Sequence, residues 1–408
     1  MNSRVVMILS AFPQLSESFI INKVVGLLRL GWDVHIVCSI SAPKEWENFP
    51  HLKQSKDFKQ RVHQTWPVHP SWLVIFLYPF ALLKCLFTNP KGLLGYFKRG
   101  WKNHAWAIFK RFYLDFQIIA LMPDLIHFEF GAIALGRSDL NYLLDCKEVV
   151  SFRGYDLNYL GLDQPDYYKT VWTNANGFHF LGNDLHLRAL RRGFPIEKLF
   201  ALIPPAIDTE TFNPYGKETV SVVGTIEHPY RILSVGRLEW KKGYEFALQA
   251  VKNLIDHGVV CEYRIIGDGS YLAPLAVARH QLDLDETVKI LGGLPREKVV
   301  EQLKWADVFL HSAVSEGFCN AVLEAQSMQL PVVCTDADGL SENILDGVTG
   351  FLVTRRDPKA LANRLEILAG NALLREKMGL SGRERVITNF QLQDQINNFN
   401  SFYHQVLC

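Results

Sequence analysis

The stretch 311–351 constrains the fold of this 408-residue chain more than any other part of it. An apolar run at 308–310 leads into a loop in which Glu316 precedes a glycine, and a helical pattern follows with Glu324 two turns along it. That pattern stops before a proline and a second apolar run. Strand, glycine loop, helix and strand form a βαβ unit, which places backbone N–H groups and a positive helix end at the carboxyl edge of a parallel sheet. The sequence therefore predicts a ligand site there, with two carboxylates reaching two parts of one molecule.

The same alternation fills the rest of the chain. Apolar strands followed by glycine or polar loops recur before and after a polar linker, and the composition, 48% apolar and 21% charged, is typical of a folded globular protein. We expect an α/β protein with two Rossmann-like domains that face each other across a cleft, and a last helix that crosses back. The expected N-terminal domain is 1–212, with 390–408 packing back on it, and the expected C-terminal domain is 213–389.

Charge and cysteine content narrow the class of protein. The net charge of +1 provides no field for nucleic acid, so no nucleic-acid partner is expected. Seven scattered cysteines without a C-x-x-C motif fit reduced thiols in a cytoplasmic protein better than disulfides or a metal site. The apolar N-terminus has one positive charge and no small-residue cleavage site, which favours a first strand over a signal peptide. No window holds the 18 uninterrupted apolar residues of a membrane span.

The segment 58–114 has an unusual composition. It contains nine Lys/Arg and no acid, and aromatic side chains alternate with the cations. This pattern suits peripheral contact with an anionic membrane, which would place the protein at the inner face of that membrane. Ordinary domain helices with inward aromatics and solvated lysines show the same pattern, and the sequence leaves both interpretations open.

The candidate catalytic and binding residues follow the predicted strands of the second half of the chain. Arg237 and Lys242 flank the start of a helix, where two cations and free N–H groups suit a diphosphate. Glu324 can accept two ribose hydroxyls, and Glu316 with the N–H groups of 317–319 can hold a sugar ring.

Taken together, the motifs of 231–353 resemble the retaining glycosyltransferases of family 4, which have the GT-B fold. In chain order they read G-R-L-x-x-x-K-G, G-D-G-S, G-G-L-P, E-G-F-x-N-x-x-x-E-A, L-P-V-V and D-G-x-T-G-F. The resemblance implies a UDP- or GDP-type nucleotide sugar as donor, no cofactor and no divalent metal, because two cations neutralise the leaving diphosphate. The residues it implies are Arg237, Lys242 and Glu316 as catalytic groups, with Gly236, Gly267, Leu294, Gly317, Phe318, Cys319, Asn320 and Glu324 around the nucleotide and sugar.

The N-terminal half resembles a subgroup that assembles exopolysaccharide and lipopolysaccharide, through F-P-x-L-S-E-S-F-I at 12–20 and S-F-R-G-Y-D at 151–156. The acceptor-side candidates are Ser16, His127, Arg153 and Asp156. Arg153 stands where the family has a histidine, and we expect it to meet a phosphate or an acidic acceptor. His127 fits a hydrogen-bonded structural histidine better than a catalytic one.

The resemblance implies transfer of a hexose to an acceptor hydroxyl, on a saccharide or a lipid-linked molecule, with retention. Front-face attack is favoured, because the sequence offers no nucleophile near Glu316. Two alternatives stay open. One is another enzyme on this scaffold, such as a phosphorylase or an epimerase, for which Glu129 and Asp156 are the available carboxylates. The other is a non-catalytic sugar-nucleotide-binding partner subunit.

Overall fold

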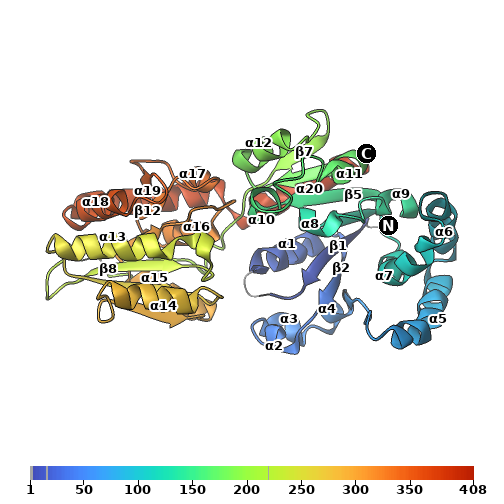
Figure 1. The fold of residues 1–408 in the computed structure, drawn as a ribbon, viewed down its shortest axis with the longest axis horizontal. Helices are drawn as coiled ribbons and strands as arrows, with labels where there is room; N and C mark the ends of the chain where they lie inside the picture. Colours follow the sequence, from blue (N-terminus) through green and yellow to red (C-terminus); the bar gives the residue numbers. More distant parts are fainter. Residues whose placement is uncertain (1–2, 15–16, 219) are drawn as a thin grey trace. The chain divides into compact units, whose positions relative to one another are not determined.

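The computed structural model describes residues 3–14, 17–218 and 220–408. The chain forms two compact units, each built on one parallel sheet (Figure 1). The N-terminal unit is 1–181, 185–203 and 395–408, and the C-terminal unit is 182–184 and 204–394. Residues 204–212, expected in the first domain, thus belong to the second. Their place is fixed there because the Phe212 carbonyl accepts hydrogen bonds from Ser327 Oγ at 2.7 Å and from Arg383 at 3.3 Å.

The sheet of the N-terminal unit has the order β3-β2-β1-β4-β5-β6-β7, and its strands pair in parallel. Successive strands run outward from β1 on one side and from β4 on the other, so the order reverses between these two. The strands are β1 (Arg4–Ala11), β2 (Asp33–Ile40), β3 (Val62–Gln64), β4 (Leu125–Phe128), β5 (Lys147–Phe152), β6 (Gly177–Phe180) and β7 (Leu199–Leu202).

Helices cover this sheet and build its core. Phe399 and Tyr403, from the last helix, pack in one buried cluster with Val5 and Leu9 of β1. The apolar spacing of the final segment therefore packs one side of residues 395–408 into the core of the N-terminal unit. The main helices are α1 (Ser18–Arg29), α8 (Gly131–Ala134), α9 (Leu140–Leu144), α10 (Gly154–Asn158), α11 (Lys169–Asn174), α12 (Asn183–Arg191) and α20 (Leu392–Leu407), and short helices α2 (Pro43–Trp46), α3 (Pro50–Gln54) and α4 (Lys56–Gln60) precede β3.

Three further helices, α5 (Ser71–Thr88), α6 (Pro90–His104) and α7 (Ala107–Leu121), separate β3 from β4 and lie together at one edge of the unit (Figure 1). Pro79 lies inside α5, and the helix continues through it. The carbonyl that Pro79 leaves without an N–H partner belongs to Ile75, whose turn of the helix faces outward. In the described chain α5 is the one helix long and apolar enough to cross a membrane.

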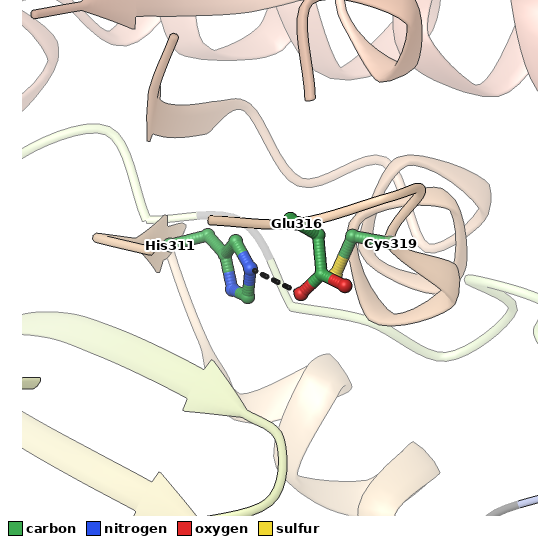
Figure 2. Close-up of side chains that lie close together, drawn as sticks. All are labelled: His311, Glu316 and Cys319. Carbon is green, nitrogen blue, oxygen red and sulfur yellow. Dashed lines mark ion pairs between the residues drawn. The ribbon is translucent and has the colours of Figure 1, made fainter. Parts of the chain in front are cut away.

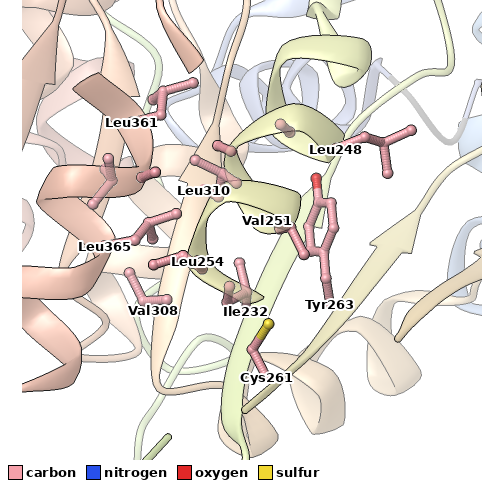
Figure 3. Close-up of a cluster of buried hydrophobic side chains, with 14 of the residues drawn as sticks. Ile232, Leu248, Val251, Leu254, Cys261, Tyr263, Val308, Leu310, Leu361 and Leu365 are labelled. Atoms are coloured by element: carbon pink, nitrogen blue, oxygen red, sulfur yellow. The ribbon is translucent and has the colours of Figure 1, made fainter. Parts of the chain in front are cut away.

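The sheet of the C-terminal unit has the order β10-β9-β8-β11-β12-β13, again parallel. Its core fills with aliphatic side chains such as Ile232 on β8, Leu254 on a covering helix and Leu310 on β11 (Figure 3). The strands are β8 (Tyr230–Val235), β9 (Cys261–Ile266), β10 (Val288–Gly292), β11 (Val308–His311), β12 (Val332–Thr335) and β13 (Gly350–Val353). The helices are α13 (Tyr244–Asp256), α14 (Leu272–Gln281), α15 (Arg296–Trp305), α16 (Asn320–Ser327), α17 (Leu340–Asn343), α18 (Pro358–Ala369) and α19 (Ala372–Asn389). The strand order reverses between β8 and β11, which is where a sheet of this type binds ligands.

Candidate functional site

The predicted donor residues lie on the loops that follow β8, β9, β10 and β11, at the carboxyl edge of the C-terminal sheet. Gly236 follows β8 and Gly267 follows β9, and the two loops that begin with these glycines touch. A Cβ atom on Gly267 would lie 1.9 Å from the Gly236 carbonyl oxygen, and the φ angle of Gly267 is 149°. Only glycine fits this contact, which explains why the motif after β9 needs it.

Hydrogen bonds also join the loop after β8 to the loop after β11. Lys242 ends a 3-10 turn, η2 (Trp240–Lys242), and its carbonyl accepts a hydrogen bond from Ser312 Oγ at 3.2 Å. The N–H of Val314 donates to the Lys241 carbonyl at 2.8 Å. Gly243 has a φ of 60° and lies so close that a Cβ would come within 2.3 Å of the Ser312 carbonyl. These contacts hold Lys242 against the loop that carries Glu316.

A buried charge cluster results. Lys242 Nζ forms an ion pair with Glu316 Oε2. His311 Nε2 lies 3.6 Å from the same oxygen (Figure 2). Burial alone would lower the pKa of Lys242, but the Glu316 carboxylate raises it above its ordinary value. Burial also opposes ionisation of Glu316, yet Lys242 and His311 hold the pKa of Glu316 well below its usual range. Both members of the pair are therefore charged at neutral pH.

Cys319 completes the cluster. Burial would raise the pKa of the Cys319 thiol, but His311 and Lys242 lower it. His311 was not among the predicted site residues, although a polar residue that ends an apolar strand at a switch point was a usable signal. It is 4% exposed, and burial acts to lower its pKa, whereas Cys319 and Glu316 raise it.

The same three residues present potential metal ligands. The ligand atoms of His311, Glu316 and Cys319 all lie within 4.8 Å of one another, and an imidazole, a carboxylate and a thiolate are groups that zinc accepts. The Lys242 ammonium, however, already pairs with the carboxylate, so a dication would have to displace it. The positive charge that faces this loop edge belongs to the protein itself.

The loop after Glu316 has a specific pattern of backbone amides. The Asn343 side chain forms two hydrogen bonds with the backbone of Cys319. Asn343 Oδ1 accepts from the Cys319 N–H at 3.1 Å, and Asn343 Nδ2 donates to the Cys319 carbonyl at 2.9 Å. This corrects the expectation that the Cys319 N–H faces a sugar. The N–H groups of Gly317 and Phe318 have no acceptor among the described residues. Asn343 was missed because its partner lies 24 residues away, with no local signal for the contact.

Three further donor-side residues flank this cluster. The Arg237 side chain is 61% exposed and pairs with Glu239 at 3.2 Å, so its guanidinium is open to a ligand. Glu324 lies on α16, partly buried, one turn after Asn320, the first residue of the helix. Burial raises the pKa of Glu324 to about 7, against the opposing effect of Arg296. Leu294, in the loop after β10, is half-buried.

The acceptor-side predictions fall in the N-terminal unit, and Ser16 lies outside the described residues. Arg153 follows β5. Its Nη2 donates to Glu129 Oε2 at 3.1 Å and its Nε to the Glu129 carbonyl at 3.1 Å. The other carboxylate oxygen of Glu129 pairs with Lys23. Two cations thus surround one fully buried carboxylate, which makes Glu129 unsuited to the acid-base role that an epimerase would need.

One acceptor-side assignment is corrected, and His127 is the structural histidine that the sequence favoured. Asp156 is fully buried and accepts the N–H groups of Ala132 at 2.8 Å and Arg153 at 2.9 Å, so it caps α10 and is not exposed to a ligand. His127 is also fully buried, and both of its ring nitrogens have partners: Nδ1 meets Tyr403 OH, and Nε2 lies 2.7 Å from Ser151 Oγ. It is a core histidine.

Comparison with known proteins agrees with this arrangement. Residues 217–385 match the family model described as "Glycosyl transferases group 1". The chain is 28% identical over 400 residues to the amylovoran biosynthesis glycosyltransferase AmsK of Erwinia amylovora, covering 93% of this chain and 94% of that protein. It is 26% identical over 404 residues to the putative colanic acid biosynthesis glycosyltransferase WcaL of Salmonella typhimurium, covering 94% and 95%.

Solved structures show the fold over the full length. The sucrose-phosphate synthase of Thermosynechococcus elongatus superposes with a TM-score of 0.73 at 17% identity, covering 99% of each chain. HepE of Anabaena, in complex with UDP and glucose, superposes with a TM-score of 0.71 at 14% identity, covering 99% of this chain and 100% of that one. Two Rossmann-like units with this strand order are the expected GT-B fold.

Proposed function

Residues 217–385 belong to the group 1 glycosyl transferases, and from that premise we propose that the chain is a metal-independent retaining hexosyltransferase that uses a nucleotide-diphosphate sugar. The observation that carries this proposal is the buried Lys242 ammonium, held charged by Glu316 at the switch point of the C-terminal sheet. A fixed cation in a poorly solvated site stabilises a departing diphosphate without the need for a metal ion. Arg237, exposed beside it, supplies a second donor fork that suits phosphate oxygens.

The loop after Glu316 supports a role in holding the sugar. The N–H groups of Gly317 and Phe318 have no protein acceptor in the described chain, so they can donate to ligand oxygens. Glu316 has one carboxylate oxygen on Lys242 and can accept a sugar hydroxyl with the other. Glu324, farther along α16, can accept two hydroxyls of a ribose once it is ionised.

The proposed reaction proceeds on the front face of the sugar. The bond between the anomeric carbon and the diphosphate oxygen breaks, and its electron pair leaves with the nucleoside diphosphate. The acceptor oxygen forms the new bond on the same side, and its proton passes to the leaving phosphate oxygen. Lys242 and Arg237 compensate the charge that develops on that diphosphate, so the protein contributes position and electrostatics and no nucleophile.

The names of the relatives support a place in cell-surface polysaccharide or glycolipid assembly. AmsK is a protein of amylovoran biosynthesis and WcaL a putative protein of colanic acid biosynthesis, and each aligns along more than nine-tenths of its length. The proposed donor is a nucleotide-diphosphate sugar of the UDP or GDP type, and HepE, which shares the fold, holds UDP and glucose. The proposed acceptor is a saccharide or a lipid-linked saccharide, and the proposed location is the cytoplasm.

One pair of measurements tests the proposal. A crystal of the chain with UDP should show the diphosphate beside Arg237 and Lys242 and the ribose beside Glu324, and UDP lodged elsewhere would overturn the site. A panel of UDP- and GDP-sugars, assayed with saccharide acceptors, should show release of nucleotide from one donor. Arg237→Ala, which changes an exposed side chain, should reduce that release while leaving thermal unfolding unchanged. UDP binding without turnover of any donor would instead support the non-catalytic partner subunit.

A further inference from the structure

Helix α5 presents an unpartnered apolar face. Its exposed side chains recur every three or four residues, and the largest exposed fractions are 68% for Trp72, 75% for Ile75, 62% for Phe76 and 82% for Phe87. A spacing of three and four residues places them on one side of the helix. The face is completed by Phe80, Leu83 and Leu86, each at least 46% exposed. A soluble monomer rarely leaves so long an apolar stripe in water.

The turn between α6 and α7 adds a cluster of exposed aromatic rings. The Trp101 and Trp106 rings lie 5.0 Å apart, and the Trp106 and Phe109 rings lie 5.7 Å apart. Trp106 is 76% exposed, and Leu94, two turns before Trp101 on α6, is 71% exposed. Because α5, α6 and α7 pack on one another, these residues and the stripe of α5 belong to one substructure (Figure 1). We call the exposed apolar residues of α5–α7 the apolar patch.

Cations accompany the apolar patch. Lys91, Lys98 and Lys102 on α6 are exposed at spacings of seven and four, on the helix side that also carries Leu94 and Trp101. None of these lysines has an ion-pair partner among the described residues. The segment 58–114 contains no acid that would repel an anionic surface. Lysines with long apolar stems beside tryptophans are the side chains found where a protein meets lipid headgroups.

The opposite faces of α5 and α6 pack against the rest of the protein. On α5, Cys85 Sγ donates to the Phe116 carbonyl of α7 at 3.3 Å, and Lys84 donates to Gln117 at 2.5 Å. On α6, Tyr96 is fully buried and donates to Asp115 at 2.9 Å. Helix α5 therefore has one protein-facing side and one open side. A helix of this kind lies in the plane of a membrane surface and does not cross it.

We propose that the apolar patch of α5–α7 docks on a lipid bilayer that contains anionic lipids, with the rings and aliphatic side chains in the interface and Lys91, Lys98 and Lys102 among the headgroups. Charge decides between a bilayer and a second copy of this chain. A second copy would bring the same acid-free, lysine-bearing surface and like charges would face each other, whereas anionic headgroups complement it. The inference goes beyond the proposed function and stands without it.

The test is flotation of the full-length chain with vesicles. One set contains equal parts of phosphatidylglycerol and phosphatidylcholine, and the other contains phosphatidylcholine alone. We expect binding at least about tenfold stronger to the anionic vesicles, because each of the three lysines adds to the attraction. Phe76→Glu with Phe87→Glu should abolish binding, and Lys91→Glu with Lys98→Glu and Lys102→Glu should reduce it to the level seen with phosphatidylcholine. The matched control is Leu373→Glu on α19, which is 79% exposed in the other unit and should bind like the wild type.

Because every substituted side chain is exposed, the variants should fold, and circular dichroism checks this. A second readout needs no variant: lipids brominated in their acyl chains should quench part of the tryptophan fluorescence, since Trp72 and Trp106 would lie in the interface. Absence of flotation with anionic vesicles would overturn the proposal. Flotation that is unchanged in Phe76→Glu with Phe87→Glu would also overturn it. The same holds if the wild type is a dimer that does not bind vesicles and that dissociates in this variant.

Discussion

Lys242 Nζ and Glu316 Oε2 form an ion pair in which both side chains are at most 15% exposed, and they lie 74 residues apart in the chain. Hydrogen bonds from Ser312 Oγ and from the Val314 N–H join their loops, so the pair has a fixed place in the site. Each partner makes burial of the other tolerable, because a lone buried charge is far more costly than a pair.

Replacement of Lys242 by Ala should affect both catalysis and stability. Turnover should fall by about 100- to 1000-fold, the loss typical of one preorganised donor at a developing charge. The free energy of unfolding should fall by about 3–5 kcal/mol, because Glu316 is left as an uncompensated buried charge. Steady-state kinetics and urea unfolding measure the two effects.

The double variant Lys242→Met with Glu316→Gln separates the effect on turnover from the effect on stability. It removes both charges and should recover most of the lost stability while turnover stays low. Lys252→Ala, on the exposed surface of α13, is the control and should change neither quantity. Recovery of turnover along with stability would mean that Lys242 has a purely structural role.

Glu324 should make nucleotide affinity depend on pH. Burial raises its pKa to about 7, so below pH 7 the carboxyl holds a proton and can accept only part of the ribose contact. We expect the Kd for UDP to rise by up to about tenfold per pH unit below 7, measured by calorimetry between pH 5.5 and 8.5. Glu324→Gln should bind more weakly at pH 8.5 and should lack this dependence. A parallel slope in the variant would assign the titration to the ligand phosphate.

Glu324 should affect protein stability and nucleotide affinity in opposite directions as pH rises. The pH dependence of stability therefore serves as a control for folding. The pKa of Glu324 in the folded protein lies above the ordinary value of 4.5, so the native state binds the proton more tightly. Its contribution is present below pH 4.5 and is lost as pH rises towards 7. Glu324→Gln should therefore unfold at a higher temperature than the wild type at pH 8, even though it binds UDP less well.

Much of this organisation could be predicted from local patterns in the sequence. The apolar strands and their glycine loops alternate at short range, so they indicate two parallel sheets, and loops at strand ends place Lys242 and Glu316 at one edge. Contacts between distant residues carry no such pattern. Two examples become visible only in the folded chain. The Asn343 side-chain amide accepts a hydrogen bond from the Cys319 N–H, and backbone N–H groups donate to the Asp156 carboxylate.

The segment 58–114 shows the same limit. Its composition was equally compatible with inward and outward aromatics, because periodicity gives the face of a helix but not its neighbour. The structure divides the aromatics: Tyr96 and Phe112 are fully buried, and Trp72 and Phe87 are exposed.

Cys319 should be the most reactive buried thiol. The pKa of Cys319 is lowered by His311 and Lys242, whereas burial raises the pKa of Cys38 to about 11 and that of Cys261 to about 12. Only the thiolate attacks an alkylating agent, so iodoacetamide at pH 7 should modify Cys319 ahead of those two. UDP should slow the modification if the donor site surrounds this residue.

Peptide mapping by mass spectrometry locates the modified thiol, and it is best done in Cys408→Ser, because Cys408 is exposed and would react first. Loss of turnover should parallel the modification of Cys319. Reaction at Cys38 at the same rate as at Cys319 would show that accessibility, and not the charge cluster, sets the order.

His127 lies in a chain of buried hydrogen bonds with a defined direction. The Ile203 carbonyl can only accept, so His179 Nε2 donates to it at 2.8 Å, and His179 Nδ1 accepts from Ser151 at 2.7 Å. Ser151 in turn accepts from His127 Nε2, which leaves His127 Nδ1 as the acceptor for Tyr403 OH. Burial lowers the pKa of His127 well below its ordinary value, in keeping with a neutral ring.

Tyr403→Phe removes the donor at the end of this chain and leaves a buried ring nitrogen unpaired. The free energy of unfolding should fall by about 1–3 kcal/mol in urea, the cost of one unsatisfied buried acceptor. The exposed Tyr142→Phe is the matched control and should lose nothing measurable. Because His127 lies in the core, away from any ligand, kcat and KM should change less than about twofold. A large fall in kcat with an unchanged free energy of unfolding would instead support a role for His127 in acceptor binding. A structural histidine should change the free energy of unfolding more than kcat.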